Sequence, residues 1–216
     1  MTQEKLRLEL DRLEKMKEFE KKYAAFSRIA GVDEAGRGPL AGPVVAAAVI
    51  LPGDETYLYL NDSKKVTAKR REKLFEEITQ TAIAYGIGAV GPERIDEINI
   101  LQATYEAMGQ ALEKIQPAPD LLLNDAVVIP GVRVKQVAIV QGDARSVSIA
   151  AASILAKVTR DRMMEAYDQL YPEYGFCAHK GYGTQRHREA LLKLGPCPIH
   201  RRSFIGRILA KPGEKL

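Results

Sequence analysis

Cysteine is scarce in this chain of 216 residues, which contains only Cys177 and Cys197. The two lie in different local contexts and form no CxxC pair. Neither a disulfide framework nor a cysteine-bound zinc site is therefore expected, and a reducing compartment is favoured. No apolar run approaches the ~20 residues of a membrane-spanning helix, and the charged N-terminus lacks the apolar segment of a signal peptide. These absences predict a cytoplasmic protein that is not bound to a membrane.

The chain also lacks the motifs of several common enzyme classes. Its histidines, His179, His187 and His200, form neither an HExxH motif nor a zinc-finger spacing, which disfavours a zinc hydrolase. A GxSxG elbow and a GxxxxGK[ST] loop are absent too, so neither a serine hydrolase of that type nor a P-loop enzyme is supported. We expect no small-molecule cofactor.

Charge of one sign does not dominate the composition. Lys and Arg total 32 against 28 Asp and Glu, giving a net charge of +4. A surplus this small permits binding to a polyanion without requiring it. Hydrophobic residues make up 46% of the chain and charged residues 28%, as in ordinary globular proteins. The length fits one domain with a small appendage.

Short apolar runs alternate with amphipathic segments, which predicts an α/β fold. Three strands in succession favour an antiparallel meander, and the helical crossover that follows favours further strands added in parallel. We therefore expect a mixed five-stranded sheet flanked by helices. The expected strands are residues 28–32, 43–51, 82–90, 121–123 and 132–140. The expected helices are residues 2–24, 67–81, a short one from Pro92, one from Asn99 to near Pro117, a long one between 142 and 172, and 184–195.

The first segment of the chain differs in character from the rest. Residues 2–24 are rich in Lys and Glu, with apolar residues at three- and four-residue steps, which predicts an amphipathic helix with a narrow apolar stripe. We expect residues 1–25 to form an N-terminal helical extension docked on a domain of residues 26–216. The C-terminal part of that domain is expected to be helical.

Four acidic residues follow apolar runs at the ends of predicted elements. Asp33 and Glu34 end the first strand, Asp125 ends the fourth, and Asp143 lies between the fifth strand and the long helix. If these carboxylates meet, they would bind hard divalent cations, Mg²⁺ or Mn²⁺, through oxygen ligands. Two such ions would suit hydrolysis of a phosphodiester, one activating water and the other stabilising the leaving oxygen.

Each of these acids also has an ordinary structural explanation. Asp143 could be the N-cap of the long helix, Asp125 could be a turn residue, and Asp33 and Glu34 could be solvated acids at a strand end. Several other acids are expected on solvated faces: Asp62, Glu76, Glu77, Asp96 and Glu97.

The acid pair is followed directly by the turn Gly36-Arg37-Gly38. Glycines beside an arginine let backbone amides and a guanidinium approach a ligand closely. The turn leads into Pro39 and a second strand, not into a helix, so it is not a dinucleotide-binding fingerprint. It suggests instead a metal site adjoining a group that contacts phosphate or sugar.

Five stretches, taken in order, resemble bacterial ribonuclease HII, the type 2 ribonuclease H. They are residues 32–44 (VDEAGRGPLAGPV), 62–65 (DSKK), 142–161 (GDARSVSIAAASILAKVTRD), 179–184 (HKGYGT) and 199–204 (IHRRSF). The resemblance covers about residues 28–206. It implies a ribonuclease H-like fold and a hydrolase that cuts RNA paired with DNA.

The resemblance also implies roles for individual residues. Asp33, Glu34, Asp125 and Asp143 would be the catalytic ligands of two Mg²⁺ or Mn²⁺ ions. The substrate-binding residues would be Gly36, Arg37 and Gly38 at the ribonucleotide, Lys64 at a phosphate, and Tyr182 against the sugar of the next deoxynucleotide.

The family's substrates are RNA–DNA hybrids and duplex DNA with embedded ribonucleotides. Cleavage on the 5′ side of the ribonucleotide would leave a 3′-hydroxyl and a 5′-phosphate. Two other functions stay open: a non-catalytic hybrid-binding module, and a DNA-cleaving nuclease of the same fold. Roles are also left open for Lys65, Lys180, the pair Arg160-Asp161, and His200-Arg201-Arg202.

Overall fold

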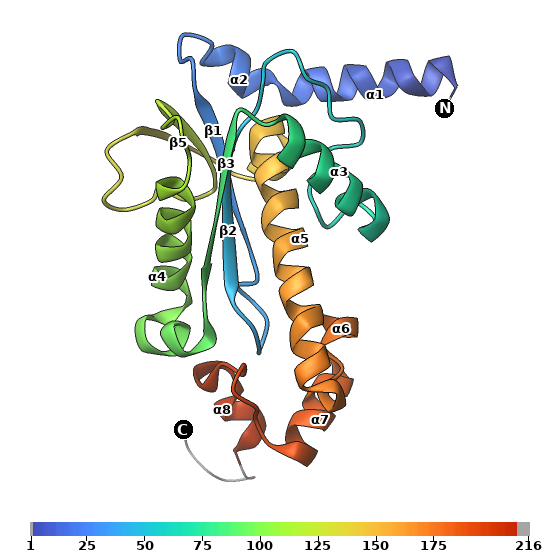
Figure 1. The fold of residues 1–216 in the computed structure, drawn as a ribbon, viewed down its shortest axis with the longest axis vertical. Coiled ribbons are helices and arrows are strands. Elements are labelled where there is room, and N and C mark those ends of the chain that lie inside the picture. The colour runs from blue at the N-terminus through green and yellow to red at the C-terminus, as the bar shows by residue number, and fades with distance from the viewer. Residues whose placement is uncertain (1, 211–216) are drawn as a thin grey trace.

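The computed structural model describes residues 2–210, and its centre is a mixed five-stranded sheet (Figure 1). The strand order is β3-β2-β1-β4-β5. The β1/β2 and β2/β3 pairs are antiparallel, and the β1/β4 and β4/β5 pairs are parallel. This arrangement confirms the predicted meander with parallel strands added to it. The strands are β1 (Ile29–Ala35), β2 (Val44–Ile50), β3 (Ala84–Val90), β4 (Leu121–Asp125) and β5 (Lys135–Ile139).

Helices cover both faces of the sheet. The helices are α1 (Gln3–Met16), α2 (Glu18–Lys22), α3 (Ala68–Thr81), α4 (Pro92–Glu113), α5 (Val147–Leu170), α6 (Phe176–His179), α7 (Gln185–Leu194) and α8 (Arg202–Leu209). In β2, Ala47 and Val49 pack with α5, whereas Ala46 and Ala48 pack with α4. Because successive strand residues point to opposite faces, α4 and α5 lie on opposite sides of the sheet (Figure 1).

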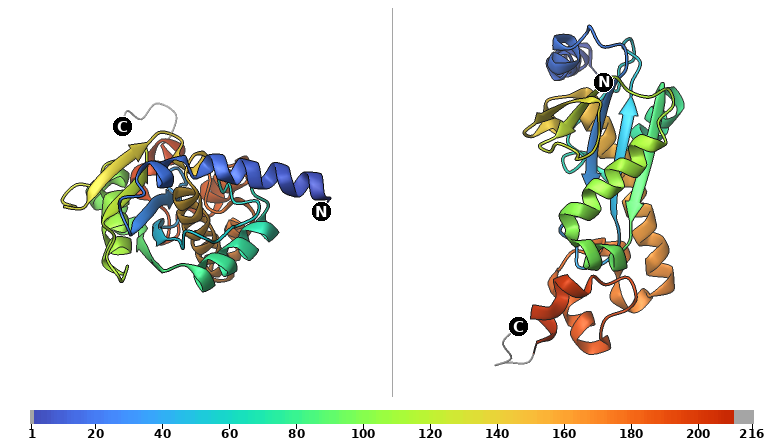
Figure 2. Two further views of the ribbon diagram at one scale, coloured as in Figure 1. Left: turned by 90° about the horizontal axis from the view of Figure 1, so that it is seen from above. Right: turned by 90° about the vertical axis from the view of Figure 1, so that its left-hand side faces the viewer.

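The N-terminal segment forms two helices where one was expected over residues 2–24. The break is at Lys17, which caps the end of α1 and the start of α2. Leu13 and Met16 are buried in the cluster that includes the α5 core, which confirms that the segment docks on the rest of the molecule. Figure 2 shows α1 reaching outward from one end of the sheet. The division at residue 25 stays a prediction, and residues 1 and 211–216 lie outside the described residues.

Side-chain caps begin the helices where the sequence predicts. The hydroxyls of Thr67 and Thr184 accept hydrogen bonds at the first turns of α3 and α7. Asn99 has a positive φ of 67° and interrupts α4, and its side chain accepts from the amides of Leu101 and Gln102. The predicted pair of helices starting at Pro92 and Asn99 is therefore confirmed as the two halves of α4.

Some element boundaries differ from the prediction. β1 continues through Asp33 and Glu34 to Ala35, because its pairing with β2 extends to Val45. β5 is shorter than predicted and begins at Lys135. Helix α8 was not predicted; it begins where the carboxylate of Asp96 accepts from two successive backbone amides. Asp96 therefore caps a helix and does not merely face solvent.

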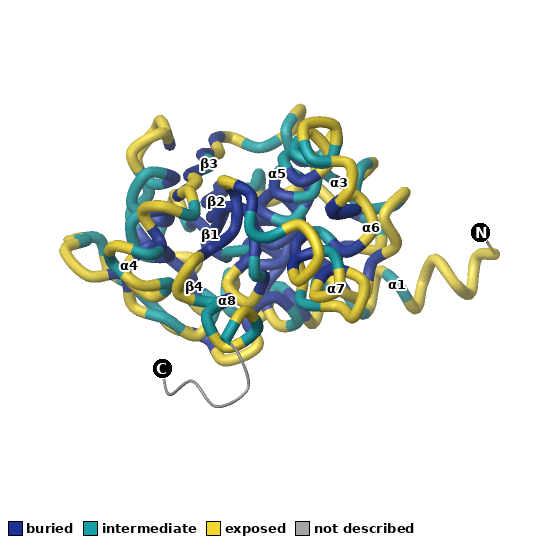
Figure 3. The backbone as a smooth tube through the Cα atoms, turned by 90° about the horizontal axis from the view of Figure 1, so that it is seen from below, coloured by how far each residue is buried: buried dark blue, intermediate teal, exposed yellow. Residues whose placement is uncertain are grey.

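The backbones of β1 and α5 approach each other closely in the core. A Cβ built on Gly31 would lie 2.0 Å from the backbone carbon of Ser148, so only glycine allows this approach. Figure 3 shows the central strands and α5 buried, with α1 exposed at the edge. Within residues 2–210, no helix is both long enough and apolar enough to cross a membrane.

Candidate active site

Three of the four predicted acids meet at one end of the sheet. In the parallel pair β1/β4, Val32 is opposite Asn124, which brings the next residues, Asp33 and Asp125, side by side. Asp143 joins them from the 3₁₀ turn Gly142–Ala144 that follows β5. Each of the three offers an oxygen, and these oxygens all lie within 4.8 Å of one another. The fold thus brings together carboxylates from three separate segments.

The ordinary explanations for two of these acids do not hold in the structure. The N-cap of α5 is Ser146, whose hydroxyl accepts from the amide of Ile149 at 3.2 Å, so Asp143 is not the cap. Asp125 does not start a free turn either, because its Oδ1 accepts from the Gly142 amide at 2.7 Å. That bond ties the end of β4 to the turn that carries Asp143.

The carboxylates destabilise one another's charged forms. Asp33 is 5% exposed, and its pKa is raised well above the usual value, first by burial and then by the charges of Glu34 and Asp125. Burial likewise raises the pKa of Asp143, with Asp62 and Asp125 adding to the effect. A cation placed among these oxygens would relieve both desolvation and repulsion.

Glu34 lies beside this group and not within it. Adjacent strand residues point to opposite faces, so the side chains of Asp33 and Glu34 diverge although the two residues are neighbours in sequence. Glu34 Oε1 accepts from Arg37 at 3.3 Å, while Oε2 is buried and has no hydrogen-bond partner among the described residues. Burial also raises the pKa of Glu34, whereas Arg37 lowers it.

These observations fit a divalent-metal site. The donors are all carboxylate oxygens, which hard cations prefer over imidazole or thiolate. A buried oxygen without a partner is costly unless a ligand satisfies it, and Glu34 Oε2 faces that situation next to three clustered carboxylates.

Two buried arginines hold the turn that follows the acids. The Arg201 guanidinium donates to the carbonyls of Gly36 at 2.6 Å and Arg37 at 2.9 Å. Arg160 donates to the carbonyl of Pro43 at 2.9 Å. Gly36 has φ +96°, and a Cβ on it would lie 2.0 Å from Arg160 Nε, so both conformation and space require glycine there.

Tyr182 and Lys64 are two residues to which the resemblance assigns substrate contacts. Both line a cleft of about 850 Å³ together with the four acids. A Cβ on Gly38 would be 3.9 Å from the Tyr182 ring, which is 45% exposed. The tyrosine ring therefore lies next to Gly38 of the Gly36–Gly38 turn, and Tyr182 as a residue remains partly exposed. Lys64 is exposed and lowers the pKa of Asp143 by its charge.

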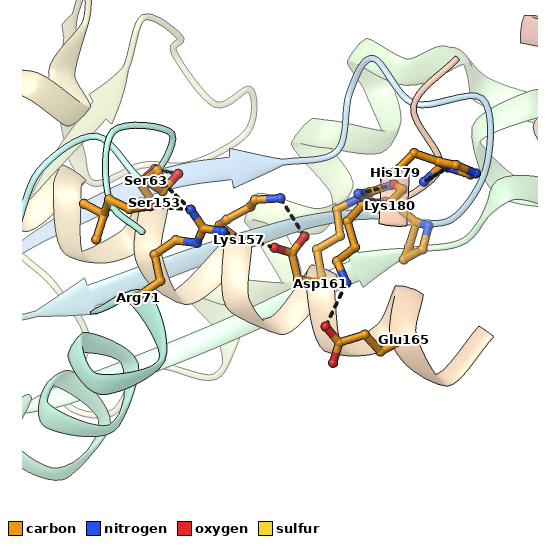
Figure 4. A network of polar contacts seen from close by, with 12 residues as sticks. Ser63, Arg71, Ser153, Lys157, Asp161, Glu165, His179 and Lys180 are labelled. Atoms are coloured by element: carbon orange, nitrogen blue, oxygen red, sulfur yellow. Dashed lines mark hydrogen bonds and ion pairs between the residues drawn. The ribbon is translucent and has the colours of Figure 1, made fainter. Parts of the chain in front are cut away.

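The structure assigns positions to the residues whose roles were open. Lys65 pairs with Asp62 at 3.9 Å and is exposed. Lys180 pairs with Glu165 at 2.7 Å (Figure 4). Arg160 and Asp161 have separate partners, since Asp161 pairs with Lys157 at 2.6 Å and with Arg71 at 3.7 Å (Figure 4).

Sequence reasoning missed several residues that line this cleft or lie beside its acids. Asp62 was expected on a solvated face; that prediction is wrong, because its side chain is only 15% exposed and its charge raises the pKa of Asp143. Ser153 and Lys157 of α5 also line the cleft. Their signal is visible in the sequence: they lie four residues apart in the first half of α5, which is otherwise mostly alanine and branched aliphatic residues, and this spacing places both on one face.

Comparison with known proteins identifies the family. The family model described as Ribonuclease HII matches residues 30–207. The ribonuclease HII of Lachnoclostridium phytofermentans is 58% identical over 202 residues, covering 94% of this chain and 80% of that protein. That of Ruminiclostridium cellulolyticum is 57% identical over 199 residues, covering 91% and 78%.

A solved structure also shares the fold. The ribonuclease H2 from Pyrococcus horikoshii OT3 superposes with a TM-score of 0.70 at 32% identity, covering 84% of this chain and 97% of that one. From the family match over most of its length and relatives of such high identity, the chain belongs to the ribonuclease HII family.

Proposed function

We propose that this protein cuts the 5′ side of ribonucleotides embedded in duplex DNA, using two Mg²⁺ or Mn²⁺ ions held by Asp33, Glu34, Asp125 and Asp143. Membership in the ribonuclease HII family makes it a ribonuclease H, a hydrolase that acts on RNA–DNA hybrids. The proposal concerns the site residues, the metals and the position of the cut. The absence of a membrane-spanning helix among residues 2–210 is consistent with our further proposal that the protein acts in the cytoplasm.

One observation carries the proposal: the carboxylate cluster and the Gly36–Gly38 turn with Tyr182 opposite line a single cleft. Divalent cations bound by the carboxylates would supply an activated water and stabilise the leaving oxygen. The turn would place backbone groups at the ribose, where hydrogen bonds to the 2′-hydroxyl select RNA. The exposed Tyr182 ring would pack on the following deoxyribose, which lacks that hydroxyl.

Lys64 and Arg37 would serve the same substrate. Lys64 is an exposed cation at the rim of the cleft, suited to a backbone phosphate. Arg37 is 45% exposed and pairs with Glu34, so it can exchange that partner for a phosphate. An Arg37→Ala variant should therefore lose more in substrate affinity than in metal affinity.

The test uses four duplexes that differ in one strand: all DNA, all RNA, a single ribonucleotide, and the same ribonucleotide followed by a second one. Each is incubated with Mg²⁺, with Mn²⁺ and with chelator, and the ends of the products are identified. We expect cutting only with metal and only of ribonucleotide-containing strands, leaving a 3′-hydroxyl and a 5′-phosphate. Equal cutting of the all-DNA duplex would indicate a DNA nuclease, and binding without cutting would indicate a hybrid-binding module.

A further inference from the structure

The three histidines of the chain form one buried cluster next to the backbone of Tyr182. Their spacing in the sequence matches no metal-binding motif. His187 of α7 stacks on His179 with ring centroids 4.3 Å apart, and its Nε2 lies 3.0 Å from Nε2 of His200. His179, His187 and His200 are 9%, 0% and 2% exposed. Nothing in the proposed chemistry uses them, yet buried imidazoles of this kind need a full set of hydrogen-bond partners.

The partners of His179 define its tautomer. The backbone amide of Gly181 donates to Nδ1 at 3.2 Å, so Nδ1 carries no proton. The ring proton is then on Nε2, which donates to the carbonyl of Tyr174 at 2.9 Å. His179 is therefore a neutral imidazole that holds the residue before Tyr182 by its amide.

Hydrogen-bond partners also define the tautomers of His187 and His200. His187 Nδ1 lies 2.9 Å from the Tyr182 carbonyl, and a carbonyl only accepts, so Nδ1 is protonated. At the other end, the Cys197 amide donates to His200 Nδ1 at 3.0 Å, which is shorter than the 3.3 Å between Nδ1 and the Cys197 carbonyl; this assigns the His200 proton to Nε2. That proton is donated to the bare Nε2 of His187, and the hydrogen bonds run in one direction from Cys197 to Tyr182.

The three histidines are uncharged, and the hydrogen bonds between them run in one direction. Burial lowers the pKa of each ring, to about 4 for His200, where the neighbouring His187 and Arg202 act in the same sense. Around His179, Arg186 lowers the pKa and Asp168 raises it. A proton added to His187 would set two N–H groups against each other at the 3.0 Å contact with His200.

We propose that the three histidines are positioning residues that hold the backbone on both sides of Tyr182 and so fix its ring opposite the Gly36–Gly38 turn. The inference rests on the proposed role of Tyr182 at the deoxyribose. The same backbone is also bonded to the segment that follows the turn, since the Leu40 amide donates to the Gly181 carbonyl at 2.8 Å. The cluster therefore controls how well the protein recognises the sugar that follows the ribonucleotide.

A matched pair of substitutions separates this role from simple packing. The amide nitrogen of asparagine reaches the position of Nδ1, so His187→Asn keeps the donor to the Tyr182 carbonyl. Glutamine places its amide at the position of Nε2, so His187→Gln keeps the contact with His200 and loses that donor. Both variants fill similar space, and their unfolding temperatures show whether they fold equally well.

The readout is a specificity ratio: kcat/KM for a ribonucleotide followed by DNA, divided by kcat/KM for a ribonucleotide followed by RNA. We expect His187→Gln to lower this ratio about tenfold, the factor associated with one lost buried hydrogen bond, and His187→Asn to keep most of it. The same ratio in both variants would overturn the proposal. If Tyr182→Ala leaves the ratio unchanged, the proposed role of Tyr182 fails instead.

A second measurement tests the cluster without any activity. In ¹⁵N NMR spectra of histidine-labelled protein at neutral pH, protonated and bare ring nitrogens have distinct shifts. We expect one ring protonated on Nδ1, two protonated on Nε2 and no cation, with the Nδ1 form lost in His187→Gln. Any other set of tautomers in the wild type would overturn the proposed hydrogen-bond arrangement of the three histidines, independently of the activity measurements.

Discussion

The clustered acidic side chains of the cleft destabilise the folded protein when no metal is bound. The carboxylates of Asp33, Asp125 and Asp143 lie within 4.8 Å of one another, and burial of Asp33 strengthens their repulsion by lowering the local dielectric. Glu34 adds a buried oxygen without a hydrogen-bond partner among the described residues. In the metal-free protein these groups oppose folding, and a divalent cation bound among them would offset that cost.

The substitution Asp33→Asn tests whether the carboxylates that bind metal also destabilise the metal-free protein. A neutral amide is a poorer metal ligand, so we expect cleavage to fall by more than about 100-fold. The same change removes a buried charge next to Glu34 and Asp125, so the unfolding temperature without metal should rise. Near-normal turnover, or a lower unfolding temperature without metal, would contradict the assigned role.

The raised pKa values also predict how metal binding depends on pH. A carboxyl group whose pKa is higher in the folded state binds more protons there than in the unfolded chain, so stability falls as pH rises through that interval. The pKa values of Asp33, Glu34 and Asp143 are all raised. Mn²⁺ should therefore raise the unfolding temperature at neutral pH, with a gain that vanishes toward pH ~4, near ordinary carboxyl pKa values.

Calorimetric scans with Mn²⁺ and with chelator across this pH range provide the measurement. The Asp33→Asn protein is the control, because its smaller set of carboxylates should reduce the Mn²⁺-dependent gain at every pH. A gain that stays constant into acid would show that the ion binds elsewhere.

At the scale of elements, α5 links the core to the cleft. Its first half is buried against β1 and β2, and the polar residues Ser153, Lys157 and Arg160 lie at steps of four and three residues on the side that faces the cleft. The helix can carry these groups to the acids only because Gly31 lets the backbone of Ser148 come close. The packing of β1 on α5 therefore determines the geometry of the site.

The substitution Gly31→Ala should disrupt this packing. Its Cβ would lie 2.0 Å from the Ser148 backbone carbon, and backbone cannot move aside as a side chain can. We expect a loss of about 3 kcal/mol or more in the free energy of unfolding, measured by urea denaturation. Gly109→Ala is the control: it lies in α4 with open space around it, and should gain about 0.5–1 kcal/mol. Equal effects would show that the close approach is not limiting.

Across the whole molecule, distant segments converge on the Gly36–Gly38 turn. Arg160 comes from α5 and Arg201 from the segment before α8, and both end on backbone carbonyls of residues 36–43. Tyr182 reaches the same place from the loop before α7. The predicted substrate-binding surface is therefore assembled from three parts of the chain, and only the complete fold forms it.

Replacing Arg201 should loosen that assembly. Arg201→Met fills similar space but leaves the carbonyls of Gly36, Arg37 and Gly42 without their donor. We expect a loss of about 3 kcal/mol in stability and a fall of about 100-fold in kcat/KM on the single-ribonucleotide duplex. Arg202→Met, at the exposed neighbouring position, should change both much less. If the two variants behave alike, Arg201 does not hold the turn.

Features that depend on residues close together in the sequence could be predicted, whereas those that depend on distant residues mostly could not. The starts of α3 and α7 at Thr67 and Thr184 were predicted correctly, because an N-cap depends on residues only three positions away. Asp62 and Asp96 were misjudged because their partners, near Asp143 and at α8, are distant in sequence. His179, His187 and His200 were missed for a different reason: most of their partners are nearby backbone groups, which any residue type supplies, so the sequence does not distinguish a buried histidine from an exposed one.

The sequence by itself determined the α/β class, the order of strands and helices, and the family, because these depend on local periodicity, capping residues and long motifs. It also supplied the four acids and the Gly36-Arg37-Gly38 turn as candidates. Only the tertiary structure decided that Asp33, Asp125 and Asp143 cluster while Glu34 lies beside them, since strand alternation and register place side chains in space. It likewise decided that Arg160 and Arg201 hold residues 36–43, because hydrogen bonds between residues this far apart in sequence leave no local pattern.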